Sequence, residues 1–350
     1  MSRYLNYKKS REFLEGMQRP TIVYHKDADG VCSAALLQEM VSGSAAPNDG
    51  PGIQLSEGLT ESLKDSENVI FLDLPVDQLS VLEELKGKKI FVLDHHPPER
   101  NLTDGDILHQ NPRFENPEAY LPASYLAYRI VEEEGVKAWK AGVGVVGDHG
   151  VEDCKDLLER VKEEDPEIIG NRDYTYEEMK ESKLGMIADM IQASKVVGGL
   201  DGIKKSQRII RTVEEPNQVF QTELKDFYET YKEELAKEED RFEDRAEYFP
   251  TTNSYLYGMS SRYSLGSDLS TSISNKKPDA VILVYQKENY GMKISGRCQS
   301  GRRDVSNIIK EGVGEYGSGG GHPQAAGGFV ESGKEGLVLE RFREKLEGVS

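Results

Sequence analysis

Four short apolar runs, each followed by aspartate or histidine, constrain the fold of this chain more than any other feature. They are Thr21–Tyr24 before His25-Lys26-Asp27-Ala28-Asp29-Gly30, Val69–Leu72 before Asp73, Ile90–Leu93 before Asp94-His95-His96, and Val143–Gly147 before Asp148-His149. Uninterrupted apolar runs of this length are typical of buried strands. In open α/β sheets, ligands bind outside the carboxyl ends of the strands. The pattern therefore predicts one cluster of oxygen and imidazole groups where four strands end.

Strands alternate with helical segments over residues 1–195. This rhythm predicts an N-terminal α/β domain with a doubly wound, mostly parallel sheet. The helices expected in it are Val31–Val41, Pro75–Lys86, Pro122–Val131 and Glu152–Glu164.

Beyond this domain the pattern changes twice. Residues 196–250 include the charged segment Leu224–Tyr248, whose aromatic residues share one face, and they predict a helical connector. Residues 251–350 alternate again and predict a smaller α/β domain that ends in the helix Gly336–Glu347. Its expected strands are Ser254–Tyr257, Ala280–Tyr285 and Tyr290–Ser295, the last two joined by a turn at Gln286–Asn289.

The formal net charge of −18 bears on the class of partner. It disfavours a protein that coats long duplex nucleic acid by neutralising phosphates. A nucleic-acid enzyme remains compatible with it, because bound divalent cations present positive charge locally.

Composition also predicts the compartment. No apolar stretch approaches the ~20 residues that a membrane helix needs. Cys32, Cys154 and Cys298 lie far apart and form no CxxC pair. We expect a cytoplasmic protein with no membrane association, disulfide framework or zinc–thiolate site.

The strand ends supply a mixed set of metal ligands. The candidates are His25, Asp27, Asp29, Asp73, His95, His96 and Asp148. Imidazole with carboxylate suits Mn²⁺, Fe²⁺, Co²⁺ or Zn²⁺, whereas pure oxygen cages suit Ca²⁺ or Mg²⁺. The set is too large for one four-coordinate zinc, and it fits two metals about 3.5–4 Å apart that share a carboxylate. Taken singly, such an aspartate is usually a helix cap, but agreement at four strand ends argues for a site.

A second motif lies in the C-terminal domain. The run Gly317–Gly328 contains His322 among six glycines. Glycines let backbone N–H groups approach an anion closely, although such a run alone is also typical of a flexible loop. Arg297, with Arg302 or Arg303, could hold a phosphate through its guanidinium fork.

Together these motifs resemble the DHH phosphoesterase superfamily, in the branch that includes RecJ exonuclease and the nanoRNase/pAp-phosphatase enzymes. Asp94-His95-His96 matches the motif that names the superfamily. His25–Gly30, Asp73 and Gly147-Asp148 resemble its first, second and fourth motifs. Gly319–Gly327 matches the glycine-rich motif of the DHH-associated domain, so the resemblance spans nearly the whole chain.

The resemblance implies a role for each residue. His25, Asp27 and Asp73 would bind one metal; Asp29, Asp73, His95 and Asp148 would bind a second, with Asp73 bridging. Asp94 would orient His95, and His96 would hold the scissile phosphate or protonate the leaving group. Arg297, Gly320, Gly321 and His322 would bind substrate. The metal implied is Mn²⁺, with Mg²⁺ or Co²⁺ as alternatives.

The expected activity is a two-metal phosphodiesterase or exonuclease that releases nucleotides from single-stranded, short DNA or RNA through an activated water. Cleavage of a cyclic dinucleotide and dephosphorylation of pAp are the alternatives within the same class. A non-catalytic RecJ-like replication factor would be expected to have lost ligands that this chain keeps. Polyphosphate hydrolysis is disfavoured because relatives with that activity carry another C-terminal domain. The resemblance also suggests replication or repair partners, and the connector would suit a homodimer.

Overall fold

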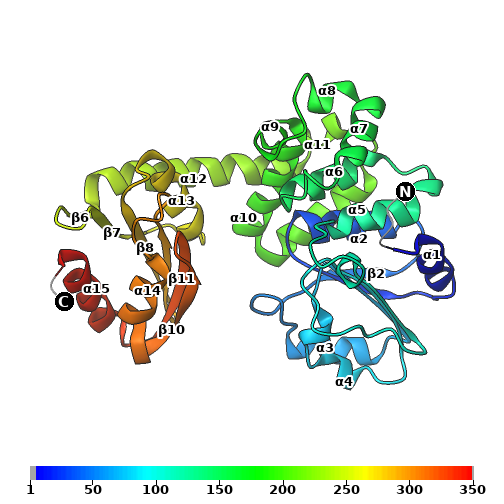
Figure 1. Cartoon of the computed structure of the whole chain (residues 1–350), viewed down its shortest axis with the longest axis horizontal. Helices are drawn as coiled ribbons and strands as arrows, with labels where there is room; N and C mark the ends of the chain where they lie inside the picture. Colours follow the sequence, from blue (N-terminus) through cyan, green and yellow to red (C-terminus); the bar gives the residue numbers. More distant parts are fainter. Residues whose placement is uncertain (1–4, 349–350) are drawn as a thin grey trace. The chain divides into compact units, whose positions relative to one another are not determined.

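The computed structural model describes residues 5–348, which form two compact units divided between Tyr228 and Glu229 (Figure 1). The division falls inside helix α12 (Glu223–Arg245). The first part of the predicted connector therefore belongs to the first unit, and helix α10 (Lys183–Thr212) runs across the boundary expected after residue 195. In residues 5–348, no helix is both long and apolar enough to span a membrane.

The first unit is built on a five-stranded sheet of order β2-β1-β3-β4-β5, in which every strand pair is parallel. The strands are β1 (Thr21–Tyr24), β2 (Ser44–Pro47), β3 (Asn68–Leu72), β4 (Lys89–Leu93) and β5 (Ile107–Gln110). The order reverses between β1 and β3, which is the switch point where doubly wound sheets bind ligands. The fold class predicted from the sequence is confirmed.

Helices cover both faces of this sheet (Figure 1). The helices of the unit, besides α10 and α12, are α1 (Tyr7–Glu15), α2 (Ala28–Leu37), α3 (Glu57–Lys64), α4 (Val81–Glu84), α5 (Ala123–Val131), α6 (Ala138–Gly147), α7 (Lys155–Glu164), α8 (Pro166–Ile169), α9 (Tyr176–Lys180) and α11 (Pro216–Val219), with 3₁₀ turns η1 (Val76–Gln78), η2 (Pro112–Phe114) and η3 (Glu132–Glu134). Alternate strand residues enter opposite cores: Phe91 packs with residues of α2, α5, α6 and α10, whereas Val92 packs with residues of α3 and α4. Because both faces are buried, the strands read as continuous apolar runs.

The predicted strand Val143–Gly147 is wrong, since these residues form the last half of helix α6. Its valines favour extended structure and its glycines disfavour a helix, but close helix contacts override these local preferences. A Cβ on Gly144 would lie 2.3 Å from Ser124 Oγ, and one on Gly147 would lie 2.6 Å from the Ala28 Cβ. The glycines therefore let α6 approach α5 and α2, and Asp148 follows a helix end instead of a strand end.

Two smaller differences concern the same unit. Strands β2 and β5 are short and partly polar, and the sequence pattern did not predict them. The expected helix Pro75–Lys86 is broken into η1 and α4, with Leu79 in extended conformation between them.

The second unit contains a six-stranded mixed sheet of order β10-β11-β9-β8-β7-β6. Its elements are β6 (Glu247–Phe249), β7 (Ser254–Gly258), α13 (Gly266–Lys276), β8 (Val281–Glu288), β9 (Gly291–Arg297), α14 (Val305–Val313), η4 (Gly314–Tyr316), β10 (Gly317–His322), β11 (Ala325–Glu331) and α15 (Glu335–Glu347). Strand β8 extends through most of the predicted turn, so that Asn289 and Tyr290 alone join it to β9.

The glycine run forms the hairpin of β10 and β11 and is not an irregular loop. Helix α14 lies directly on it, because a Cβ on Gly319 or Gly328 would come within 2.9 or 2.8 Å of Ile309 Cγ2. Gly320 differs, since a Cβ there would meet open space. Part of the run thus serves helix packing, while Gly320 leaves exposed backbone that a ligand could approach.

Candidate metal centre

Asp73 lies at the centre of the site, directly after β3. Its backbone adopts φ +58°, a left-handed conformation that is uncommon outside glycine and that concentrates at functional sites. The side chain is buried, with 1% of its residue surface exposed. Its Oδ2 lies 3.3 Å from His25 Nδ1, and its Oδ1 lies 3.2 Å from His95 Nε2. The two oxygens therefore face two different groups of ligands.

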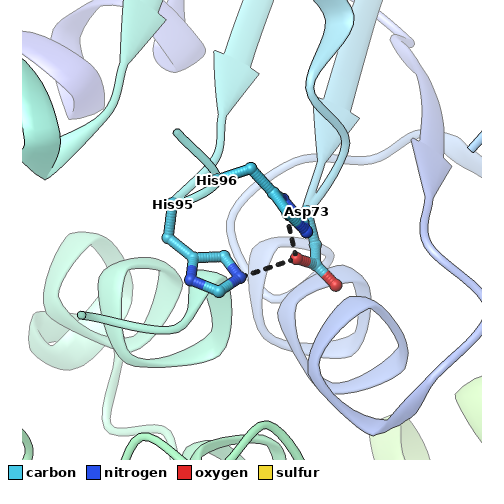
Figure 2. Close-up of side chains that lie close together, drawn as sticks. All are labelled: Asp73, His95 and His96. Atoms are coloured by element: carbon cyan, nitrogen blue, oxygen red, sulfur yellow. Dashed lines mark ion pairs between the residues drawn. The ribbon is translucent and has the colours of Figure 1, made fainter. Parts of the chain in front are cut away.

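His95 and His96 follow β4, and both rings approach Oδ1 of Asp73, as Figure 2 shows. His96 Nδ1 lies 3.9 Å from Asp73 Oδ1 but only 2.7 Å from Asp94 Oδ1. The prediction that Asp94 orients His95 is wrong, because its hydrogen bond is made with His96. Despite its burial, the bond to His96 holds the pKa of Asp94 below its usual value. The ionised carboxylate accepts only, so His96 donates from Nδ1 and keeps Nε2 for another partner.

The loop after β1 places His25 and Asp27 on the other side of Asp73. Asp27 caps helix α2, because its Oδ1 accepts the Gly30 N–H at 3.0 Å. Its Oδ2 lies 2.5 Å from His25 Nδ1. A Cβ on residue 30 would come within 2.1 Å of the His25 carbonyl oxygen, so only glycine allows this approach. The motif therefore combines a helix cap with a ligand pair.

Asp29 also has a structural partner. Its two oxygens accept the backbone N–H groups of Ala123 at 2.7 Å and Ser124 at 2.8 Å, at the N-terminus of α5. Pro122 at the N-cap has no side-chain acceptor of its own, and a carboxylate suits this end of a helix. Each carboxylate oxygen keeps a further lone pair, so this contact leaves Asp29 able to bind a cation.

Asp148 completes the cluster at the end of α6. Its Oδ2 lies 3.4 Å from His95 Nε2. The ligand atoms fall into three groups, each within 4.8 Å: His25-Asp27-Asp73, Asp73-His95-His96 and Asp29-His95-Asp148. The structure thus brings together the seven side chains that the sequence offered as candidate ligands.

Buried polar atoms without partners test whether a metal fits. Buried polar atoms in native proteins are nearly always satisfied. Among residues 5–348, both oxygens of Asp73, both ring nitrogens of His95, His25 Nδ1 and Asp148 Oδ2 have no hydrogen-bond partner. Imidazole nitrogens and carboxylate oxygens together suit transition-metal cations. The residues present therefore fit divalent metal ions, whose identity the ligand set leaves open.

The pKa values reflect crowded charges. Burial, reinforced by Asp27 and Asp29, raises the pKa of Asp73 well above its usual value. Burial and Asp29 raise the pKa of Asp148 to about 8. Burial would lower the pKa of His25, but Asp27 and Asp73 raise it to about 10. Without a cation, the cluster therefore retains protons that a metal would displace.

Sequence reasoning missed a layer of residues behind the histidines. Asn111 Nδ2 donates to the His96 carbonyl oxygen at 2.9 Å, and Arg113 Nε donates to that of His95 at 2.8 Å. The Tyr120 ring meets the His95 ring edge to face, with centroids 5.2 Å apart, and the Arg113 guanidinium lies over the Tyr120 ring. Burial, followed by the neighbouring Asp148 carboxylate, raises the pKa of Tyr120. The sequence signal that could have revealed these residues was Asn111-Pro112-Arg113, which directly follows the unpredicted strand β5.

Replacing Tyr120 tests this layer. Tyr120→Phe keeps the ring against His95 and removes the hydroxyl beside Asp148. We expect the affinity for Mn²⁺ to fall about tenfold, as for other groups that orient metal ligands. Isothermal titration calorimetry measures it. Tyr125→Phe is the matched control, because the Tyr125 hydroxyl donates to Asp156 and touches none of the seven ligands. Equal Mn²⁺ affinities in the two variants would show that Tyr120 does not support the metal centre.

The predicted substrate residues lie in the second unit. Arg297 donates to Thr271 Oγ1 at 3.1 Å, to Ser267 Oγ at 3.0 Å and to the carbonyl oxygen of its neighbour Gly296 at 2.9 Å. Arg297 and His322 both pair with Ala325, from opposite sides of β11. The two residues therefore share one end of the sheet, with the guanidinium held in place by α13.

Comparison with known protein families finds a match in each of the two units. Residues 20–148 match the DHH family, N-terminal domain, and residues 266–348 match the DHHA1 domain. No curated protein matches the sequence at a significant level.

Solved structures share the fold at low identity. The chain is similar to exonuclease RecJ bound to manganese, with TM-score 0.69 and 17% identity over 98% of this chain and 94% of that one. RecJ from Thermus thermophilus with Mn²⁺ gives TM-score 0.66 and 16% identity over 100% of this chain and 56% of that one. The DHH domain of a member of a ribosomal-protein family gives TM-score 0.67 and 18% identity over 97% of this chain and 89% of that one.

Proposed function

Because the chain belongs to the DHH superfamily of phosphoesterases and carries a C-terminal DHHA1 domain, we propose that it is a metal-dependent phosphodiesterase that releases nucleotides from short single-stranded oligonucleotides. Manganese is the cation we propose, since a similar structure, exonuclease RecJ, is described as bound to manganese. The preference for short substrates follows from the net charge of −18, which gives long nucleic acid little phosphate neutralisation.

The observation that carries this proposal is the position of Asp73 between two ligand groups. One oxygen faces His25 at 3.3 Å and the other faces His95 at 3.2 Å. A carboxylate with its two oxygens directed to two ligand groups would suit a pair of divalent cations, and paired cations act in phosphatases and nucleases. In this proposal His25 and Asp27 complete one site, while Asp29, His95 and Asp148 complete the other.

Each residue has a defined task in the reaction. Two divalent cations, when bound, supply positive charge and activate a water molecule for attack at phosphorus. Asn111 and Arg113 hold the loop that carries the histidines. Asp94 holds Nδ1 of His96, so that Nε2 is the atom left to meet the phosphate or to protonate the leaving oxygen. The same bond to Asp94 outweighs burial and raises the pKa of His96, which favours the proton-donating form.

Product analysis tests the proposal. Purified protein with Mn²⁺ is given end-labelled DNA and RNA, from dinucleotides to long strands, with cyclic di-AMP and pAp in parallel. Release of mononucleotides, fastest from short strands, is the expected result. Turnover confined to the cyclic dinucleotide or to pAp would show that this compound, and not an oligonucleotide, is the substrate. Absence of turnover with metal bound would reject the enzymatic proposal.

Arg297 provides a test of the second unit. We expect Arg297→Ala to raise KM for a short oligonucleotide about tenfold or more, because charge-assisted contacts to phosphate are among the stronger hydrogen bonds. Steady-state kinetics measure this change, and kcat should fall less than kcat/KM. Arg343→Ala is a control, since Arg343 is paired with Glu247 on the same unit. An unchanged KM in Arg297→Ala would remove Arg297 from the substrate site.

A further inference from the structure

Two aromatic rings stack beside the metal centre without a part in the mechanism above. His149 directly follows Asp148, and its ring lies on that of Tyr176 with centroids 4.0 Å apart and planes 22° apart. Tyr176 begins α9, a different element from the α6 end that carries His149. Asp148 of the metal centre and His149 of the stacked pair are therefore neighbours in the chain, and their Cα atoms lie about 3.8 Å apart.

His149 closes the end of helix α6 in a Schellman motif, since its N–H donates to the Val146 carbonyl oxygen at 3.3 Å and the Gly150 N–H donates to that of Val145 at 2.9 Å. Its backbone has φ +60°, and positive φ occurs at only four non-glycine positions among residues 5–348, Asp73 being another. The residue is exposed, although one face of its ring is covered by Tyr176. The helix end therefore fixes the backbone of His149, and it leaves an exposed residue next to the candidate ligand Asp148.

A cation accompanies the rings. Lys180 ends α9, and its side chain is 36% exposed while paired with Asp189. Tyr176 and Lys180 stand four residues apart on this helix, a spacing that puts their side chains on the same face. Proteins that bind single-stranded nucleic acid combine stacking rings with nearby positive charge in this way.

We propose that His149 and Tyr176 form a stacking platform for a nucleobase of the substrate, next to the phosphate at the metal centre. The inference rests on the proposed function, since a phosphodiester at Asp148 sets the position of the base. The platform would favour substrates with a base over base-free phosphodiesters, and it would accept any base, because every base presents a π-face.

The test compares diadenylate with analogues of the same dinucleotide that lack the base at one position or the other. All substrates are assayed with Mn²⁺. His149→Asn removes the ring and keeps the backbone, because asparagine tolerates a left-handed conformation. Tyr176→Ala removes the other ring, and Tyr176→Phe retains it. The measured quantity is the ratio of kcat/KM for diadenylate to kcat/KM for each abasic analogue, and the larger of the two ratios is followed in the variants. We expect this ratio to fall at least about fivefold in His149→Asn and Tyr176→Ala, and to stay near wild type in Tyr176→Phe.

Tyr174→Ala is the matched control, because Tyr174 lies two residues away and packs with Lys162 instead of His149. A reduced ratio in the two ring-deleted variants but not in this control supports the platform. An unchanged ratio in both, with wild-type metal content, overturns it while leaving the proposed function intact. Failure of the wild-type protein to cleave either dinucleotide would instead reject the proposed function. In that event, quenching of a 2-aminopurine dinucleotide on binding, lost in His149→Asn, still decides whether a base stacks there.

Discussion

Asp73→Asn is expected to reduce phosphodiesterase activity by at least about a thousandfold, equivalent to about 4 kcal/mol of transition-state stabilisation. Asparagine has nearly the same shape as aspartate and tolerates the left-handed backbone at φ +58°, so the change isolates the charge. Metal content, measured by mass spectrometry of the dialysed protein, should fall as well. In the absence of metal the variant should melt at a higher temperature than wild type, because it removes a carboxyl group whose ionisation is opposed by burial and by Asp27 and Asp29.

Asp77→Asn is the matched control for this experiment. Asp77 is also buried, and its Oδ2 accepts the backbone N–H groups of Glu99 at 2.5 Å and Arg100 at 3.1 Å. An amide oxygen can keep accepting those bonds, so we expect activity within about tenfold of wild type. Full activity or full metal content in Asp73→Asn would reject its role as the shared ligand.

The metal-free protein is expected to lose stability as pH rises from about 6.5 to about 8, and Mn²⁺ should reverse this trend. The folded-state pKa values of His25, about 10, and Asp148, about 8, lie above their ordinary values of 6.5 and 3.8. The stability linked to the His25 proton is therefore complete below its ordinary pKa and is lost as pH rises towards its folded-state pKa. Asp148 adds a loss of the same sign up to its own folded-state pKa. Each proton held in excess by the folded state contributes up to about 1.4 kcal/mol per pH unit.

Bound metal replaces those protons, so its affinity should increase over the same pH interval. Thermal unfolding at several pH values, with chelator and with Mn²⁺, measures both effects. At about 100 times its dissociation constant, one bound ion adds about 2.7 kcal/mol. Proton release on Mn²⁺ binding can be counted by calorimetry in buffers of different ionisation enthalpy. A melting temperature that is independent of pH, with no proton released, would contradict the protonated cluster.

The strand ends could be predicted from the sequence because parallel strands leave little freedom. In a buried parallel sheet each strand is a continuous apolar run, so β1, β3 and β4 were recognisable, and the residues after them had to meet at one edge. The glycine run was also visible, but its form as a hairpin under α14 depends on contacts with Ile309. Local composition alone could not distinguish such a hairpin from a loop.

What the sequence could not show depends on tertiary contacts. The last half of α6 has the composition of a strand. Its helical form depends on the close contacts of Gly144 with Ser124 and of Gly147 with Ala28, which the sequence does not show. The partner of Asp94 could not be inferred, because Asp94, His95 and His96 are adjacent and only geometry selects His96. The layer formed by Asn111, Arg113 and Tyr120 was missed because β5 is too short to predict.

The contact between Asp29 and helix α5 has a consequence for reading related sequences. Removing Asp29 would leave two buried backbone N–H groups without acceptors, so this aspartate is required for folding as well as for any metal it binds. A pseudoenzyme descended from this architecture could discard Asp73 and Asp148 and still need Asp29. Retention of the Asp-Ala-Asp-Gly tetrad is therefore a poor marker of activity, whereas simultaneous retention of Asp73 and Asp148, whose side chains support no helix end, is an informative one.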